Sequence, residues 1–306
     1  MPFPSHIVCC YLYPISRYGY PPQAQDSLQH IREMKALGFT SIELEGIRAD
    51  HLAAMYALRH EIHTAIGQDG LTVPYFCVVL PGLSSPNQAE RILNLKRFEQ
   101  GCEIAALLGA KGVLDNAPLP PYKFPADIPV VRHYDSAALM RASIQVELSW
   151  DTYWDQLVGT YQEACEIAAG FGLTYQMHPC EGVLAATTDA FLYFADAVNR
   201  DNLRFNLDTA NQYFLRDNLR LSLLRLKDRL DYLHISDNRG HRVEHLVPGQ
   251  GTIDFEGFFE TLREIGFRGH LGVDVGGAES DIGDLDQAYQ TTAAWLSKQW
   301  PNQSDR

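Results

Sequence analysis

The fold is decided by four short apolar stretches in the second half of the chain: Leu173-Thr-Tyr-Gln-Met-His178, Leu203-Arg-Phe-Asn-Leu-Asp208, Leu230-Asp-Tyr-Leu-His234 and His270-Leu-Gly-Val-Asp274. Each has the length of a β-strand, ends in a side chain that can bind a metal ion, and is followed by a loop and a helix-like segment. In a closed parallel barrel, the carboxyl ends of the strands meet at one face. The terminal side chains are therefore expected to converge there.

The rest of the chain continues this alternation of strands and helices, which is the pattern of a parallel sheet covered by helices. Further strands are predicted over residues 7–12, 40–44, 73–80 and 111–115. Helices are predicted over residues 24–37, 49–66, 87–108, 150–169, 188–198, 219–229, 255–265 and 284–299. Eight strand–helix units predict an α/β fold, a (β/α)8 TIM barrel that forms a single domain over residues 1–306.

One connection interrupts the spacing, an extended loop over residues 116–148 after the fourth predicted strand. It contains Ala117-Pro-Leu-Pro-Pro-Tyr-Lys-Phe-Pro125. Loops of this length inside a compact domain commonly carry function or are disordered. Two interpretations stay open: an elaborated surface loop, or a segment that covers a ligand with Tyr122, Phe124, His133 and Tyr134.

The composition excludes several classes of protein. A formal net charge of −13 and the absence of a Lys/Arg run argue against nucleic-acid binding. No apolar stretch approaches the roughly 20 residues that span a bilayer, and the start of the chain lacks the features of a signal peptide. The six cysteines form no CxxC pair, which favours buried free thiols in a reducing compartment. We expect a cytoplasmic protein with no membrane or nucleic-acid partner, and a homo-oligomer remains possible.

A metal site is the chemistry that the strand ends predict. Gln176, Asp208, His234 and Asp274 offer oxygen and nitrogen donors that suit Mn²⁺, Mg²⁺ or Zn²⁺ better than an ion that prefers thiolates. Gln176 and His178 face the same way on one strand, and either could bind the ion, with imidazole the stronger donor. Each residue alone also has an ordinary interpretation: a helix cap for Asp208, a core histidine for His234, and a turn for Asp274.

The segment 237–255 places more polar side chains beside His234. Arg239, Arg242 and His245 are candidates for contacts with substrate hydroxyl or carboxylate groups, although a solvated polar loop is the alternative. Pro248-Gly-Gln-Gly251 predicts a tight turn. Asp254 is expected to cap the helix that begins at Phe255.

The chain resembles the xylose-isomerase-like barrel superfamily, which is also called the sugar phosphate isomerase/epimerase family. The resemblance is carried by Asn206-Leu-Asp-Thr209, His234-Ile-Ser-Asp-Asn238 and Pro248-Gly-Gln-Gly-Thr-Ile-Asp-Phe255. It implies a divalent ion held by Glu, Asp, His and Glu from the last four strands, which fall by position on Gln176, Asp208, His234 and Asp274. Two glutamates are thereby replaced, one by Gln176 and one by Asp274, and Asn211 stands where many relatives have a substrate-binding histidine.

The resemblance implies an isomerase or epimerase that acts on a keto-sugar or cyclitol through an enediolate. An amide is no useful proton carrier near neutral pH, so Asp274 is the expected base. His178 or Glu181 would replace the second catalytic group, and Asn211, Arg239, Arg242 and His245 would bind the carbohydrate. The alternatives are a metal-dependent sugar lyase or dehydratase and a sugar-binding relative without catalysis. A nuclease of the apurinic-site type shares the fold but is disfavoured by the acidic charge balance.

Overall fold

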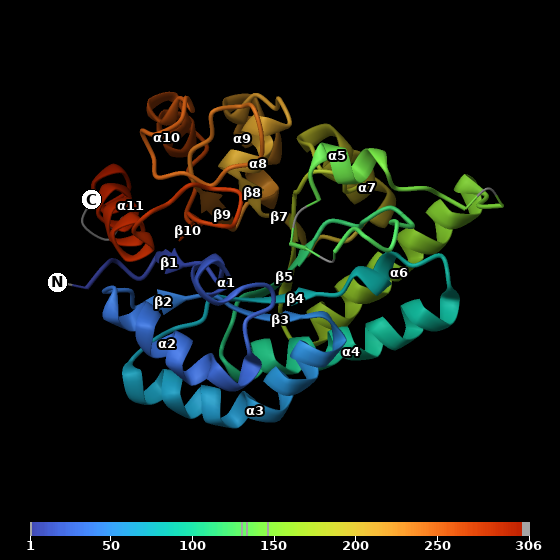
Figure 1. The fold of residues 1–306 in the computed structure, drawn as a ribbon, viewed down its shortest axis with the longest axis horizontal. Helices are drawn as coiled ribbons and strands as arrows, with labels where there is room; N and C mark the ends of the chain where they lie inside the picture. The colour runs from blue at the N-terminus through green and yellow to red at the C-terminus, as the bar shows by residue number, and fades with distance from the viewer. Residues whose placement is uncertain (1, 130, 133, 146, 302–306) are drawn as a thin grey trace.

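The chain folds into a parallel β-barrel surrounded by helices (Figure 1). The computed structural model describes residues 2–129, 131–132, 134–145 and 147–301. Its strands form two five-stranded parallel sheets, in the orders β2-β1-β10-β9-β8 and β3-β4-β5-β6-β7. Only Glu43 separates β2 from β3, and only Asn206 separates β7 from β8, so the two sheets continue into one barrel of eight strand positions. The predicted TIM barrel is confirmed.

The strands are short and almost wholly buried. Their bounds are β1 Ile7–Cys9, β2 Ser41–Ile42, β3 Leu44–Ile47, β4 Tyr75–Val79, β5 Gly112–Asn116, β6 Thr174–His178, β7 Leu203–Phe205, β8 Leu207–Asp208, β9 Tyr232–Ile235 and β10 His270–Val273. The barrel closes where β1 pairs with β10, in the register Val8 to Gly272.

The helices lie outside the barrel, as its apolar outer face requires. Their bounds are α1 Leu12–Tyr18, α2 Ser27–Ala36, α3 Arg48–Asp69, α4 Gln88–Leu107, α5 Ser136–Met140, α6 Trp150–Gly170, α7 Thr188–Val198, α8 Thr209–Phe214, α9 Leu219–Leu226, α10 Phe255–Glu264 and α11 Leu285–Gln299. Among the helices of the described residues, none is long and apolar enough to cross a membrane.

Aromatic side chains fill the inside of the barrel. The rings of Tyr75 and Tyr232 stack at 4.3 Å between centroids, and the Cys10 thiol lies 3.3 Å from the Tyr232 hydroxyl. The Tyr232 ring packs edge-on against His234, which lies nearer the carboxyl end of the same strand. The barrel interior is therefore a packed core that supports the rim, as in other barrels of this architecture.

The predicted long elements match the structure, and the differences lie in short ones. The first strand ends at Cys9, because the chain turns into α1, which the sequence pattern did not separate from the strand. The predicted helix over residues 24–37 begins with a 3-10 turn, Ala24–Asp26. Asp254 caps α10 by accepting the Gly257 N–H at 3.0 Å, as expected. Ser149 precedes α6 but makes no capping hydrogen bond with its side chain.

The long connection after β5 folds back over the carboxyl face of the barrel. It contains α5 and an antiparallel bridge between Lys123 and Ser143. The rings of Phe124 and Tyr134 stack at 4.1 Å between centroids, and Arg132 reaches within 3.6 Å of Asp274 Oδ2. The segment is therefore placed to cover a ligand at this face. His133, one of the residues named for this role, lies outside the described residues.

Candidate active site

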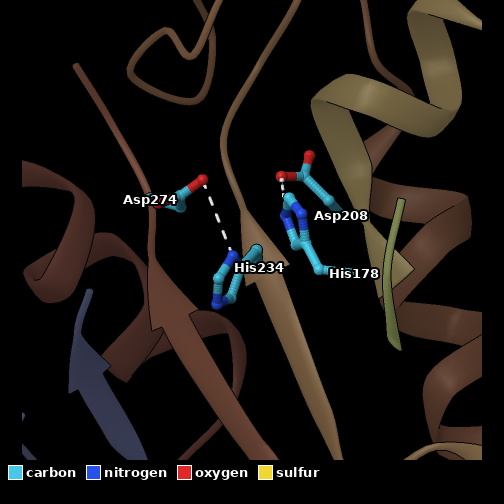
Figure 2. Close-up of side chains that lie close together, drawn as sticks. All are labelled: His178, Asp208, His234 and Asp274. Atoms are coloured by element: carbon cyan, nitrogen blue, oxygen red, sulfur yellow. Dashed lines mark hydrogen bonds and ion pairs between the residues drawn. The ribbon is translucent and has the colours of Figure 1, made fainter. Parts of the chain in front are cut away.

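Four buried side chains from the last four strand positions gather at the carboxyl face of the barrel. They are His178 at the end of β6, Asp208 at the end of β8, His234 in β9 and Asp274 just after β10 (Figure 2). One donor atom from each lies within 4.8 Å of the donors of the other three. The strand geometry thus brings two carboxylates and two imidazoles to one point.

The spacing of these donors fits a divalent ion. His178 Nε2 lies 3.2 Å from Asp208 Oδ2, and His234 Nδ1 lies 3.6 Å from Asp274 Oδ2. Two ligands that are each about 2.1 Å from one ion stand about 3.4 Å apart in a tetrahedral shell. Within the described part of the chain, neither Asp274 oxygen has a hydrogen-bond partner, although both are buried. Arg132, His234 and His245 lie 3.6 Å from its Oδ2 without hydrogen-bonding it, so a bound cation would complete the compensation of this buried charge, and the cluster suits a metal ion.

Asp208 has two roles because its two oxygens point to different partners. Its Oδ1 accepts the Asn211 N–H at 2.9 Å and thereby caps α8. Its Oδ2 faces the cluster and also accepts the Asn211 Nδ2 group at 3.0 Å. The cap and the candidate metal ligand, which were alternatives in the sequence, are therefore compatible.

Glu43 orients His234. The residue interrupts the strand between β2 and β3, and its Oε2 lies 3.1 Å from His234 Nε2. Its Oε1 accepts the backbone N–H of Tyr11 at 3.1 Å. A carboxylate on one ring nitrogen fixes the tautomer that leaves the other nitrogen available to a metal. Glu43 falls inside the strand predicted over residues 40–44, and the sequence gives no signal for this role.

His245 stands between the two carboxylates of the cluster. Its Nε2 lies 3.6 Å from both Asp208 Oδ2 and Asp274 Oδ2, and its Nδ1 lies 3.1 Å from Glu279 Oε1. Burial alone would lower the pKa of His245, but the hydrogen bonds with Asp208 and Glu279 raise it to about 10. Of the predicted substrate-binding residues, His245 is therefore the one that contacts both acidic groups.

Asp237 holds the loop that carries His245. Its carboxylate accepts the backbone N–H groups of Gly249 at 2.8 Å, Gly251 at 2.9 Å and Ile253 at 3.2 Å. A Cβ atom on Gly251 would lie 2.3 Å from Asp237 Oδ1 and 2.5 Å from the Asn238 carbonyl. The tight turn predicted from Pro248-Gly-Gln-Gly251 is thus built around a buried acid.

Gln176 does not join the cluster. Its amide nitrogen donates to Thr174 Oγ1 at 2.9 Å and to Asp231 Oδ2 at 3.2 Å, near the amino ends of β6 and β9. Gln176 and His178 point to the same side of β6, but residues two apart on a strand lie about 6.6 Å apart along it, so Gln176 lies deeper in the barrel. In β6, His178 and not Gln176 therefore occupies the rim position that the resemblance assigns to a metal ligand.

The remaining predicted residues lie at different distances from the centre. Arg239 Nη1 and Arg242 Nε bond the Glu244 carboxylate at 2.9 and 3.3 Å on the exposed side of the loop, so neither guanidinium is brought to the cluster. Glu181 accepts a hydrogen bond from Ser136 and lines the wall of a neighbouring cavity. Sequence reasoning missed Arg132, because it lies in the long connection, where no periodicity indicates which side chains turn inward.

The electrostatics of the cluster favour ionised carboxylates. Burial would raise the pKa of Asp208, but hydrogen bonds from His178 and His245 hold it well below its usual range. Burial would likewise raise the pKa of Asp274, yet His234 and Arg132 lower it. For His178, burial lowers the pKa, so a neutral imidazole is favoured. For His234, burial would lower the pKa, but the neighbouring Cys10, Asp274 and Glu43 raise it well above its usual range, so a metal ion would have to displace a proton from this ring. Ionised carboxylates and neutral imidazoles are the forms that bind metal ions.

A family model described as "Xylose isomerase-like TIM barrel" matches residues 31–299. The chain belongs to this family. Over 281 residues, which are 89% of this chain and 94% of the relative, it is 28% identical to 3-dehydro-D-guloside 4-epimerase of Escherichia coli (strain K12). An inosose dehydratase of Yersinia enterocolitica is 28% identical over 145 residues, which are 41% of this chain and 48% of the relative. Relatives of this xylose isomerase-like chain thus include sugar epimerases.

Solved structures show the same fold. The crystal structure of 3-keto-D-glucoside 4-epimerase from E. coli matches with a TM-score of 0.70 and 22% identity, over 96% of this chain and 100% of that one. D-allulose 3-epimerase from Methylomonas sp., solved in complex with D-allulose, matches with a TM-score of 0.71 and 18% identity, over 98% and 99% of the two chains. The buried His/Asp cluster is consistent with a metal site of this xylose isomerase-like family.

Proposed function

We propose that the protein is a divalent-metal-dependent epimerase or isomerase that moves a proton beside the carbonyl of a keto-sugar or cyclitol, through an enediolate. The observation that carries the proposal is the cluster of His178, Asp208, His234 and Asp274 at the rim of the barrel. The E. coli relative named 3-dehydro-D-guloside 4-epimerase, 94% of which this chain matches, supports a keto-sugar as the substrate class. Two imidazoles with two carboxylates favour Mn²⁺ or Zn²⁺ over Mg²⁺, which prefers oxygen ligands.

The ion would be held by the four cluster residues, and when bound it would act as a Lewis acid that makes the C–H beside a carbonyl more acidic. Asp274 is the proposed base, since both of its oxygens are without a hydrogen bond from the described residues. Arg132 and His245, each 3.6 Å from Asp274 Oδ2, keep this carboxylate ionised and oriented.

Glu45 is the proposed proton donor, in place of His178 and Glu181. It lines the same hollow as His178 and His234, and it is buried. Burial, together with the Glu43 charge, raises the pKa of Glu45 to about 8, so it is largely protonated at neutral pH. A carboxylic acid that titrates near the working pH is an effective proton carrier.

Deuterium exchange tests the reaction. Mn²⁺-loaded protein incubated in D₂O with 3-keto-glucosides and free ketoses should place deuterium on the carbon beside a carbonyl, as seen by NMR. Asp274→Asn should abolish exchange, and Glu45→Gln should leave exchange but block formation of the epimer. A metal-loaded protein that exchanges no proton with any of these sugars, yet binds them, would support the sugar-binding alternative instead.

A lyase is the second candidate, because the same proton removal precedes β-elimination and the relatives include inosose dehydratases. Mass spectrometry of the products separates the two reactions, since elimination removes water or another leaving group whereas epimerisation leaves the mass unchanged. The ligand set has its own test. Mn²⁺ affinity should fall strongly in His178→Leu and change little in Gln176→Leu, and the opposite result would return Gln176 to the site.

A further inference from the structure

We propose that the substrate carries an apolar, ring-bearing substituent on its sugar, as an aryl glycoside does, and that this group binds in the cavity beside the metal cluster. The inference rests on the proposed function, because it assumes that the reacting sugar lies at the cluster. It adds a second compartment with a chemistry unlike that of a sugar.

The cavity is partly open to solvent and lies between the ends of β4, β5 and β6 and the long connection. Most of its wall is apolar: Val79, Leu80, Pro81, Ala117, Pro118, Leu119, Val131 and Val183. The hydroxyl groups of a sugar gain little from these apolar residues, whereas an apolar group gains roughly 25 cal/mol per Å² that it buries. The lining therefore predicts an apolar occupant.

Aromatic side chains complete the wall and favour a planar occupant. Tyr20, Tyr134 and Tyr161 all line the cavity. The Tyr134 ring is held by stacking on Phe124 at an interplanar angle of 15°. Aromatic rings prefer offset-stacked or edge-to-face contacts with other rings.

The cavity adjoins the hollow at the cluster. Tyr20, Val79, Asn116 and Arg132 line both spaces, and the hollow also contains His178 and His234. A ligand whose sugar lies at the cluster can therefore extend its substituent past Arg132 into the cavity. A free monosaccharide would leave this second space empty of apolar contacts.

The polar groups of the cavity indicate where the substituent meets a hydrogen-bond donor. Asp115 accepts the Tyr175 hydroxyl at 3.0 Å, and Glu181 accepts the Ser136 hydroxyl, so both acids have partners. Arg48 differs: its Nε is buried and has no acceptor among the described residues. Its backbone also has φ +60°, a left-handed conformation that is unfavourable outside glycine and persists mainly at functional sites. An oxygen on the edge of the substituent would satisfy this donor.

Calorimetry of the Mn²⁺-loaded protein tests the inference with two pairs of ligands, 4-nitrophenyl and methyl β-D-glucopyranoside and the same two β-D-galactopyranosides. Burial of the aryl ring should raise the affinity by about tenfold or more in at least one pair. If neither 4-nitrophenyl glycoside bound more tightly than its methyl counterpart, or if none of the four ligands bound, the inference would be overturned. Failure of Mn²⁺ to bind at all would instead count against the proposed function.

Leu119→Asp places a charge on the apolar wall and should remove the aryl preference while the Mn²⁺ affinity stays unchanged. Leu221→Asp is the matched control, since Leu221 is exposed on α9 and does not line the cavity. An aryl preference that survives in Leu119→Asp would refute the assignment of the cavity.

Arg48→Asn tests the polar contact. Asparagine tolerates the left-handed backbone at this position, and the change should weaken binding of the 4-nitrophenyl ligand but not of its phenyl analogue.

Discussion

Glu43→Gln should weaken metal binding although Glu43 is not a proposed ligand. The Glu43 carboxylate accepts two hydrogen bonds at 3.1 Å, one from the Tyr11 N–H and one from His234 Nε2. An amide has only one acceptor oxygen, so glutamine can satisfy only one of these two donors. A buried donor left without a partner costs about 1–3 kcal/mol. If the His234 bond is the one lost, the ring is no longer held with Nδ1 toward Asp274.

We expect the Mn²⁺ affinity of Glu43→Gln to fall about 10- to 100-fold, the usual effect of removing such a supporting carboxylate, or about 1.4–2.8 kcal/mol. Calorimetric titration with Mn²⁺ measures this directly and needs no substrate. Glu61→Gln is the matched control, because Glu61 is exposed on α3 and the change in charge is the same. If both variants bound Mn²⁺ with affinities within about twofold of each other, the role assigned to Glu43 would be refuted.

Three further predictions follow from the same structure. Asp208→Asn should lower the Mn²⁺ affinity by at least about 100-fold, more than loss of a supporting carboxylate, while α8 keeps a good N-cap; full metal occupancy would contradict the ligand set. Gly272→Ala should lower the free energy of unfolding by about 1–3 kcal/mol, measured by urea denaturation, because overpacking a core is destabilising; the new Cβ would lie 2.5 Å from Cys10 Sγ and 2.6 Å from the Tyr232 hydroxyl. Burial raises the pKa of Asp115 to about 7, above its value in the unfolded chain, so it stabilises the fold at low pH and this contribution is lost as the pH rises. Between about pH 4 and 7 the loss should reach at most about 1.4 kcal/mol per pH unit, and urea denaturation of Asp115→Asn should show a flatter dependence on pH.

The sequence predicts the barrel because its long elements are strongly patterned. Strand and helix periods differ, their alternation indicates a parallel sheet covered by helices, and the number of eight strand–helix units indicates a closed barrel. The exact depth of a side chain inside the barrel does not follow from the pattern. Gln176 and His178 face the same side, and only the register of β6 against its neighbours shows that His178 reaches the rim.

Contacts between distant segments were also beyond the sequence. Arg132 comes from an irregular connection and Glu43 from the opposite side of the barrel, yet both reach the cluster through tertiary packing. Such residues carry no local signal, because their partners are set by where the loops and strand breaks lie in space. Asp208 shows the converse case, since its sequence allowed a cap or a ligand and the structure permits both roles.

The replacement of glutamate by His178 changes the charge of the centre as well as its donors. The ligand set that the resemblance implies, with two glutamates, one aspartate and one histidine, carries a charge of about −3 and leaves a divalent ion short of neutrality at about −1. His178, Asp208, His234 and Asp274 together carry about −2, so the ion would make a neutral centre. Around the ligands, Arg132, 3.6 Å from Asp274, adds a positive charge, and the Glu43 carboxylate, 3.1 Å from His234, adds a negative one. A neutral centre attracts a developing enediolate more strongly than an anionic one, and under the proposed function this would compensate for the loss of one glutamate base. The substitution therefore favours chemistry in which stabilisation of the anion matters more than a matched pair of bases, as in the proposed reaction, where Asp274 would remove the proton and the buried Glu45 would return it.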